Sequence, residues 1–229
     1  MFSSDLCSRI QESLDSILRG RDHIRLKEDN SYVSEGDLLV QSLAQEWKRT
    51  KLPHHQLISE EISSFTDEWD PYGNYVILDP IDGTENFISG LREWGMGISI
   101  YSQGVHQESC IFLPELGEMQ ITGMPWHRYK SRIMGLSSSL TSEDLANLPK
   151  RSGVEFRIIG CAMYNLLMAA RGSYCTFENI KGVNCWDILP GLNLALEAGC
   201  KTWVDDEPYR GQILFPVKKY KIKIEQGDI

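Results

Sequence analysis

The apolar positions of the first half of the chain predict two helices followed by a run of strands. Residues 4–18 place leucine and isoleucine side chains at helical spacing, and Gly20 can end that helix. A second helix is predicted at residues 38–47. Short apolar segments then predict strands at residues 56–59, 75–78, 97–101, 107–112 and 118–122. Because the last three segments have short connections, we expect them to form an antiparallel meander.

The second half alternates strands and helices after an irregular stretch at residues 123–130. Strands are predicted at residues 131–136, 156–159, 174–177 and 202–204, and helices at residues 141–148, 161–170 and 187–198. Residues 218–224 alternate lysine with apolar side chains, which indicates an edge strand. This order favours a sheet covered by helices. We therefore expect an α/β (α+β) protein with an N-terminal lobe at residues 1–125 and a C-terminal lobe at residues 126–229.

Residues 76–87 are an apolar strand that runs into two carboxylates and then a Gly-Thr turn. Pro80 lacks an N–H and is expected to end the strand, so that Asp79 and Asp82 can face one cavity. Gly83 lets the backbone come close to an anion, and the Thr84 hydroxyl lies where a helix begins. Oxygen ligands beside a helix start suit a cation and a phosphate bound together. For an arbitrary Asp-x-x-Asp-Gly segment, helix capping is the commoner explanation.

Two further acidic positions stand near predicted element ends. Glu60 and Glu61 follow the short strand at residues 56–59, where a glutamate pair is usually just a solvated surface. Asp187 follows Trp186 at the start of a predicted helix, where an aspartate can be only an N-cap. Neither position identifies a site by itself.

Taken together, these segments resemble the inositol monophosphatase family over about residues 27–204. The run from Asp79 to Thr84 matches the family's Asp-Pro-Ile-Asp-Gly-Thr signature. Trp186-Asp187, followed by Glu-Ala-Gly at residues 197–199, is similar to its second signature. There are mild departures: Ser59 and Cys200 replace glycines. Pro190 replaces an alanine, and we expect it in the first helical turn, where its missing N–H costs little.

The resemblance implies a layered αβαβα sandwich and hydrolysis of a small phosphorylated alcohol with two or three Mg²⁺ ions. Its implied metal ligands are Glu60, Asp79, the Ile81 carbonyl, Asp82 and Asp187. Its implied catalytic residues are Glu60, Thr84 and Asp82, with Thr84 and Glu60 orienting an attacking water. Its implied substrate-binding residues are Gly83, Thr84, Asp187, Glu178, Cys161 and Ala162. Lys27 and Asp37 resemble an upstream element that contributes to a mobile loop and a further metal.

The resemblance leaves the substrate open. Inositol monophosphate or a related sugar phosphate is our first expectation. The alternatives are phosphoadenosine phosphate, fructose bisphosphate or histidinol phosphate, and also a catalytically weak regulatory or scaffold member, because the chain is short and its substrate-side segment is altered. Family members are often dimers, so a homodimer is expected.

Composition limits the binding partners and the cellular compartment that we expect for this protein. A net charge of −9 over 229 residues argues against a basic nucleic-acid surface, although a bound divalent cation still allows an anionic substrate. We see no signal peptide and no apolar run long enough to span a membrane. The six cysteines are scattered without a CxxC pair, which indicates reduced thiols in the cytoplasm. A structural zinc site or a nucleophilic cysteine is less well supported.

Overall fold

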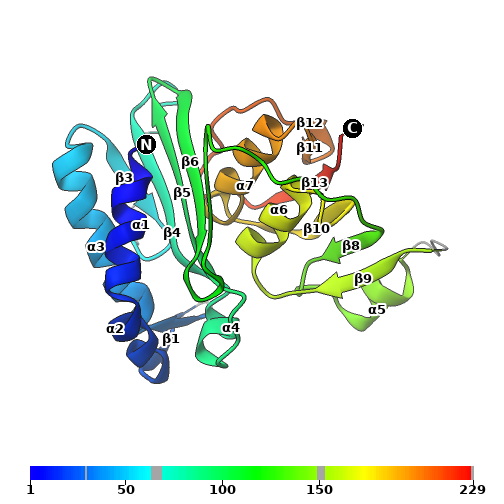
Figure 1. The fold of residues 1–229 in the computed structure, drawn as a ribbon, viewed down its shortest axis with the longest axis horizontal. Coiled ribbons are helices and arrows are strands. Elements are labelled where there is room, and N and C mark those ends of the chain that lie inside the picture. Colours follow the sequence, from blue (N-terminus) through cyan, green and yellow to red (C-terminus); the bar gives the residue numbers. More distant parts are fainter. Residues whose placement is uncertain (29, 63–68, 149–152, 228–229) are drawn as a thin grey trace.

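The computed structural model describes residues 1–28, 30–62, 69–148 and 153–227, which form alternating layers of helices and sheets (Figure 1). Helices α1 (Ser3–Glu12), α2 (Leu14–Arg19) and α3 (Glu35–Lys51) cover one face of the first sheet. Helices α6 (Ala162–Ala170) and α7 (Cys185–Glu197) lie between the two sheets, and α5 (Ser142–Ala146) lies beyond the second. The layered αβαβα architecture is confirmed.

The first sheet contains five strands in chain order. These are β3 (Gln56–Ser59), β4 (Tyr75–Asp82), β5 (Gly95–Ser102), β6 (Val105–Leu113) and β7 (Glu118–Ile121). Strand β3 is parallel to β4, and every later pair is antiparallel. The predicted meander is therefore confirmed. Helix α4 (Thr84–Ile88) follows β4, and a 3-10 turn, η2 (Pro114–Leu116), precedes β7.

Strand β4 carries side chains to two helical layers in alternation. Val76 and Leu78 pack in the core with α1 and α3, whereas Tyr75 and Ile77 pack in the core with α6 and α7. Successive side chains of a strand point to opposite faces, so Asp79 continues the second series toward α6 and α7. The expectation that the strand ends at Pro80 is wrong. The register with β5 shifts between Asp79 and Asp82, and this irregularity accommodates the proline.

The N-terminal region differs from expectation in two respects. The single helix predicted at residues 4–18 is divided at Ser13, whose φ of −94° and ψ of 2° are not helical. The segment between Lys27 and Asp37, which the resemblance assigns to a mobile loop, contains strand β2 (Tyr32–Ser34). This strand pairs antiparallel with β1 (Ile24–Leu26), which follows the 3-10 turn η1 (Gly20–Asp22). Helix α3 begins earlier than predicted because Ser34 and Asp37 form a capping box.

The second sheet has six strands in mixed directions. Their order is β12 (Glu207–Pro208), β11 (Lys201–Val204), β13 (Tyr220–Glu225), β10 (Thr176–Val183), β8 (Ile133–Leu136) and β9 (Glu155–Ile158). Strand β13, predicted at an edge, lies inside the sheet between β11 and β10. Its buried Tyr220, Ile222 and Ile224 form only one apolar face, and such a face occurs on edge and interior strands alike.

The chain leaves the first sheet at Ile121 and enters the second at Ile133, while the division into lobes at residue 125 stays a prediction. Within the described ranges, none of the helices is both long and apolar enough to cross a membrane.

Candidate metal and phosphate site

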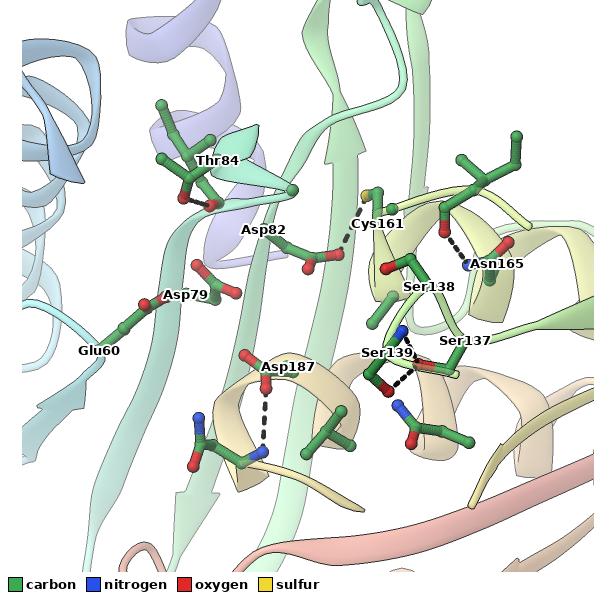
Figure 2. Close-up of a pocket in the computed structure, with 18 of the residues that line it drawn as sticks. Glu60, Asp79, Asp82, Thr84, Ser137, Ser138, Ser139, Cys161, Asn165 and Asp187 are labelled. Atoms are coloured by element: carbon green, nitrogen blue, oxygen red, sulfur yellow. Dashed lines mark hydrogen bonds between the residues drawn. The ribbon is translucent and has the colours of Figure 1, made fainter. Parts of the chain in front are cut away.

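Three carboxylates from separate elements converge between the first sheet and α7 (Figure 2). Glu60 follows β3, Asp79 lies in β4 and Asp187 is the third residue of α7. One carboxylate oxygen from each lies within 4.8 Å of the others. The parallel pairing of β3 with β4 places Glu60 beside Asp79, and the packing of α7 on β4 supplies Asp187.

Asp79 is a buried acid whose carboxylate accepts no hydrogen bond from the described residues. Its residue is 1% exposed, and neither carboxylate oxygen has a hydrogen-bond partner among the described residues. Burial, followed by the charges of Glu60, Asp82 and Asp187, raises its pKa well above the ordinary value. Leaving such a group without donors is costly. Carboxylate oxygens gathered in this way are the ligands that a hard divalent cation prefers.

Asp187 shares this electrostatic environment but is better anchored. Its Oδ2 accepts a 2.9 Å hydrogen bond from the backbone N–H of Asn184, the residue that precedes α7. Burial and the charges of Glu60 and Asp82 raise its pKa well above the usual range. Pro190 is the sixth residue of this helix, so the expectation that it lies in the first turn is wrong. The helix nevertheless continues through the buried Pro190 to Glu197.

Asp82 lines the same cavity and is held by α6. Its Oδ2 accepts hydrogen bonds from the backbone N–H of Met163 and from the thiol of Cys161, whose Sγ is 3.0 Å away. Burial raises the pKa of Asp82 to about 6 despite these donors. Burial and the charge of Asp82 also raise the pKa of the Cys161 thiol well above its ordinary value, so the sulfur keeps its proton.

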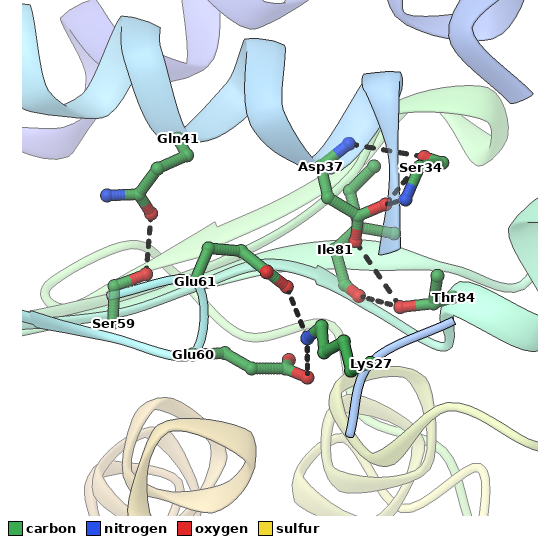
Figure 3. Close-up of polar contacts among 9 residues, drawn as sticks. All are labelled: Lys27, Ser34, Asp37, Gln41, Ser59, Glu60, Glu61, Ile81 and Thr84. Atoms are coloured by element: carbon green, nitrogen blue, oxygen red, sulfur yellow. Dashed lines mark hydrogen bonds and ion pairs between the residues drawn. The ribbon is translucent and has the colours of Figure 1, made fainter. Parts of the chain in front are cut away.

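The Thr84 hydroxyl connects the signature segment to α3 (Figure 3). Its Oγ1 lies 3.1 Å from the Ile81 carbonyl oxygen and 3.3 Å from Asp37 Oδ1. Asp37 is 1% exposed, and its other oxygen accepts hydrogen bonds from the N–H and hydroxyl of Ser34. Because the Thr84 proton has acceptors on the protein, its oxygen can accept a hydrogen bond from a water molecule.

Lys27 neutralises part of the acidic cluster. Its Nζ lies 2.9 Å from Glu60 Oε1 and 2.7 Å from Glu61 Oε1 (Figure 3). Burial raises the pKa of Glu61 to about 7, an effect that its hydrogen bond to Lys27 opposes. Burial lowers the pKa of Lys27, but the two glutamates outweigh this effect and raise it above the ordinary value. Lys27 is thus an ionic partner of the site.

A cavity of about 260 Å³ opens beside these carboxylates. Its wall includes most of the predicted site residues, namely Glu60, Asp79, Ile81, Asp82, Gly83, Thr84, Cys161, Ala162 and Asp187. Glu178 does not belong to this set: it ion-pairs with Lys223 at 3.7 Å and lines a separate surface hollow. Its neighbour Asn179 reaches the cavity instead, because adjacent strand residues point to opposite faces.

Sequence reasoning missed the uncharged polar wall of the cavity. Ser137, Ser138 and Ser139 directly follow β8, and Asn179 and Asn184 also line the cavity. Within the described ranges, no lysine, arginine or histidine lines the cavity. A signal was present in the sequence, since a serine run directly follows an apolar strand. Strand β8 is parallel to β10, and the C-terminal ends of parallel strands commonly form ligand sites.

The layered fold and the acidic cavity are accompanied by a match to known proteins. The sequence profile of the inositol monophosphatase family matches residues 2–132, more than half of the chain. The chain belongs to this family, which is a family of phosphatases.

Individual relatives are more distant. The chain is 25% identical to the Nus factor SuhB of Pasteurella multocida over 76% of its own length and 72% of the relative's. It is 23% identical to the 3'(2'),5'-bisphosphate nucleotidase CysQ of Haemophilus influenzae, over 72% and 69%.

Solved structures share the fold at lower identity. A Thermotoga maritima IMPase superposes with a TM-score of 0.80 at 23% identity, covering 99% of this chain and 91% of that one. An IMPase/NADP phosphatase complexed with Mg²⁺ and phosphate has a TM-score of 0.77 at 19% identity, covering 96% and 87%.

Proposed function

We propose that the chain is a Mg²⁺-dependent phosphomonoesterase that hydrolyses a small phosphorylated alcohol, with inositol monophosphate or a related sugar phosphate as first candidate. The observation that carries the proposal is Asp79, a buried carboxylate without donors that faces Glu60 and Asp187. A cation would relieve the charge repulsion that otherwise raises the pKa values of Asp79 and Asp187. The fold is shared with an IMPase/NADP phosphatase complexed with Mg²⁺ and phosphate.

The proposed metal ligands come from the acidic side of the cavity. Glu60, Asp79, the Ile81 carbonyl, Asp82 and Asp187 would hold Mg²⁺ in two or three positions. The chemistry that Mg²⁺ supplies when bound is Lewis-acid polarisation of water and of phosphate oxygens.

Thr84 and Glu60 would orient the attacking water, and Asp37 accepts a hydrogen bond from the Thr84 hydroxyl. The backbone N–H of Thr84, at the start of α4, would bind a phosphate oxygen, whereas the N–H of Gly83 donates to the Asp82 carboxylate. Gly83 has a φ of +82°, and a Cβ there would lie 3.0 Å from Cys161 Cβ, so a glycine is needed where phosphate and backbone meet.

The polar wall favours an uncharged leaving alcohol with one phosphate. Serine hydroxyls and asparagine amides can hydrogen-bond to the hydroxyls of a polyol. A second phosphate in the cavity would meet no cationic side chain from the described residues that line it. The resemblance to a bisphosphate nucleotidase keeps phosphoadenosine phosphate as the second candidate.

Phosphate release from a panel of substrates tests the proposal. Inositol monophosphate, fructose bisphosphate, phosphoadenosine phosphate and histidinol phosphate are compared with Mg²⁺ and with a chelator. We expect Mg²⁺-dependent release, fastest with inositol monophosphate. Asp82→Asn should lower release by at least about 100-fold, since it removes a carboxylate that would hold Mg²⁺.

The matched control is Asp206→Asn, an exposed aspartate outside the cavity. Near-ultraviolet circular dichroism verifies that both variants are folded. Folded wild-type protein that releases no phosphate from any substrate would support a scaffold role instead. Wild-type turnover by the Asp82→Asn variant would refute the assignment of this cavity as the catalytic site.

A further inference from the structure

The Cys161 thiol donates a hydrogen bond to Asp82. The residue is 1% exposed, and its Sγ lies 3.0 Å from Asp82 Oδ2. The same sulfur accepts a 3.3 Å hydrogen bond from the N–H of Tyr164 and so caps α6, a helix of nine residues. The thiol therefore joins a helix start to an acid of the cavity wall.

These bonds leave the two oxygens of Asp82 in different situations. Oδ2 is occupied by the Cys161 thiol and by the Met163 N–H. Figure 2 shows the other oxygen turned away from Cys161, on the side where Asp187 lies. An independent sign that this cavity takes a ligand is Asp79, which is 1% exposed with both oxygens unpartnered among the described residues.

We propose that Cys161 is a positioning residue for the divalent cation. Its S–H holds Oδ2 of Asp82 against the start of α6, so that Asp82 offers the cation a single oxygen in a fixed direction. Groups that hydrogen-bond to metal ligands orient them, and their loss typically weakens metal affinity about 10- to 100-fold. The inference rests on the proposed cation site and not on the identity of the substrate.

A purely structural role makes a different prediction. If Cys161 only caps α6, its removal destabilises the protein and leaves metal affinity unchanged. Cys161→Ala removes both the donor to Asp82 and the acceptor for Tyr164 N–H, whereas Cys161→Ser keeps both. The matched control is Thr141→Ala, which removes the side-chain cap of α5 at a position outside the cavity wall.

Mn²⁺ binding, measured by isothermal titration calorimetry on the full chain, distinguishes these roles without turnover. We expect Cys161→Ala to raise the dissociation constant at least about tenfold. Cys161→Ser should remain close to wild type, and Thr141→Ala should lose stability without a change in affinity. The Cys161 S–H stretching band is identified in the infrared spectrum of the wild type as the band that is absent in Cys161→Ser. This band should shift when Mn²⁺ is added. The measurement does not require the alanine variant to fold.

The outcomes separate the two proposals. Wild-type Mn²⁺ affinity in folded Cys161→Ala, or an S–H band that Mn²⁺ does not move, overturns the positioning role alone. Wild-type protein that binds no Mn²⁺ overturns the cation site and the positioning role together.

Discussion

Raising the pH in the absence of divalent metal is expected to destabilise the folded chain. Burial raises the pKa of Asp82 from an ordinary 3.8 to about 6, and the pKa values of Asp79 and Asp187 shift in the same direction. An acid whose pKa is higher in the folded state binds more protons there than in the unfolded state. The free energy of unfolding therefore falls as pH rises through the window between the two values.

The size of the effect follows from Asp82. Its shift of about two units, at 1.36 kcal/mol per unit, corresponds to a loss on the order of 3 kcal/mol between about pH 4 and pH 8. This is a large part of the 5–15 kcal/mol that is typical of a folded domain. Asp79 and Asp187 add to the loss, so the metal-free protein should be markedly less stable at pH 8 than at pH 5.

Urea unfolding followed by tryptophan fluorescence measures this in a chelator at several pH values. Asp82→Asn is the matched variant, because its amide oxygen can still accept from Met163 and Cys161. Burial lowers the pKa values of His55 and His106, which opposes the trend, but this contribution is the same in both proteins and cancels in their difference.

We expect the variant to be more stable than wild type at pH 8, and the difference to disappear toward pH 4. Mg²⁺ at 100 times its dissociation constant should then restore about 2.7 kcal/mol to the wild type at pH 8 by mass action. A difference between the two proteins that does not change with pH would refute the reasoning.

Substitutions at three further positions are checked by the same unfolding assay. Lys27→Met removes the cation shared by Glu60 and Glu61, so it should cost about 1 kcal/mol without metal and less with Mg²⁺; no loss in chelator would contradict the pairing. Ser34→Ala removes the cap of α3 and should cost about 1 kcal/mol, with Ser34→Gly milder. Gly191→Ala should destabilise by about 1–3 kcal/mol although alanine favours helix, because its Cβ would lie 2.3 Å from the Cβ of Leu166 on α6; a gain in stability would show that the two helices can separate freely.

Strands β4 and β5 could be predicted because nearly all of their residues are buried, and the meander of β5 to β7 because its connections are short. Alternation along β4 also indicated which side Asp79 faces once the helical layers were known. The β1–β2 ribbon gave no such signal. Its residues Ile24 to Leu26 are all exposed, so no burial pattern marks the strand. The pairing of β1 with β2 depends on backbone hydrogen bonds, which the side-chain pattern does not encode.

The residues of the candidate site that are contiguous in the sequence were the easiest to predict. Asp79 to Thr84 are contiguous, and the turn between them is visible in the sequence. Glu178 was assigned to the wrong face because a displacement of one residue along a strand exchanges the two faces. The partnership of Cys161 with Asp82 could not have been foreseen, because it depends on how the start of α6 meets the end of β4.

The carboxylate cluster also bears on the order of folding events. Asp187 comes about a hundred residues after Asp82, and α7 must settle against β4 before the three-carboxylate group exists. Joining residues so far apart in the sequence has an entropic cost of loop closure that local contacts do not have. An early intermediate containing only the first sheet would have Glu60 and Asp79 in place but no group to complete the cluster. Luminescence of a bound lanthanide, followed during refolding, would therefore report the arrival of α7 and not the formation of the sheet.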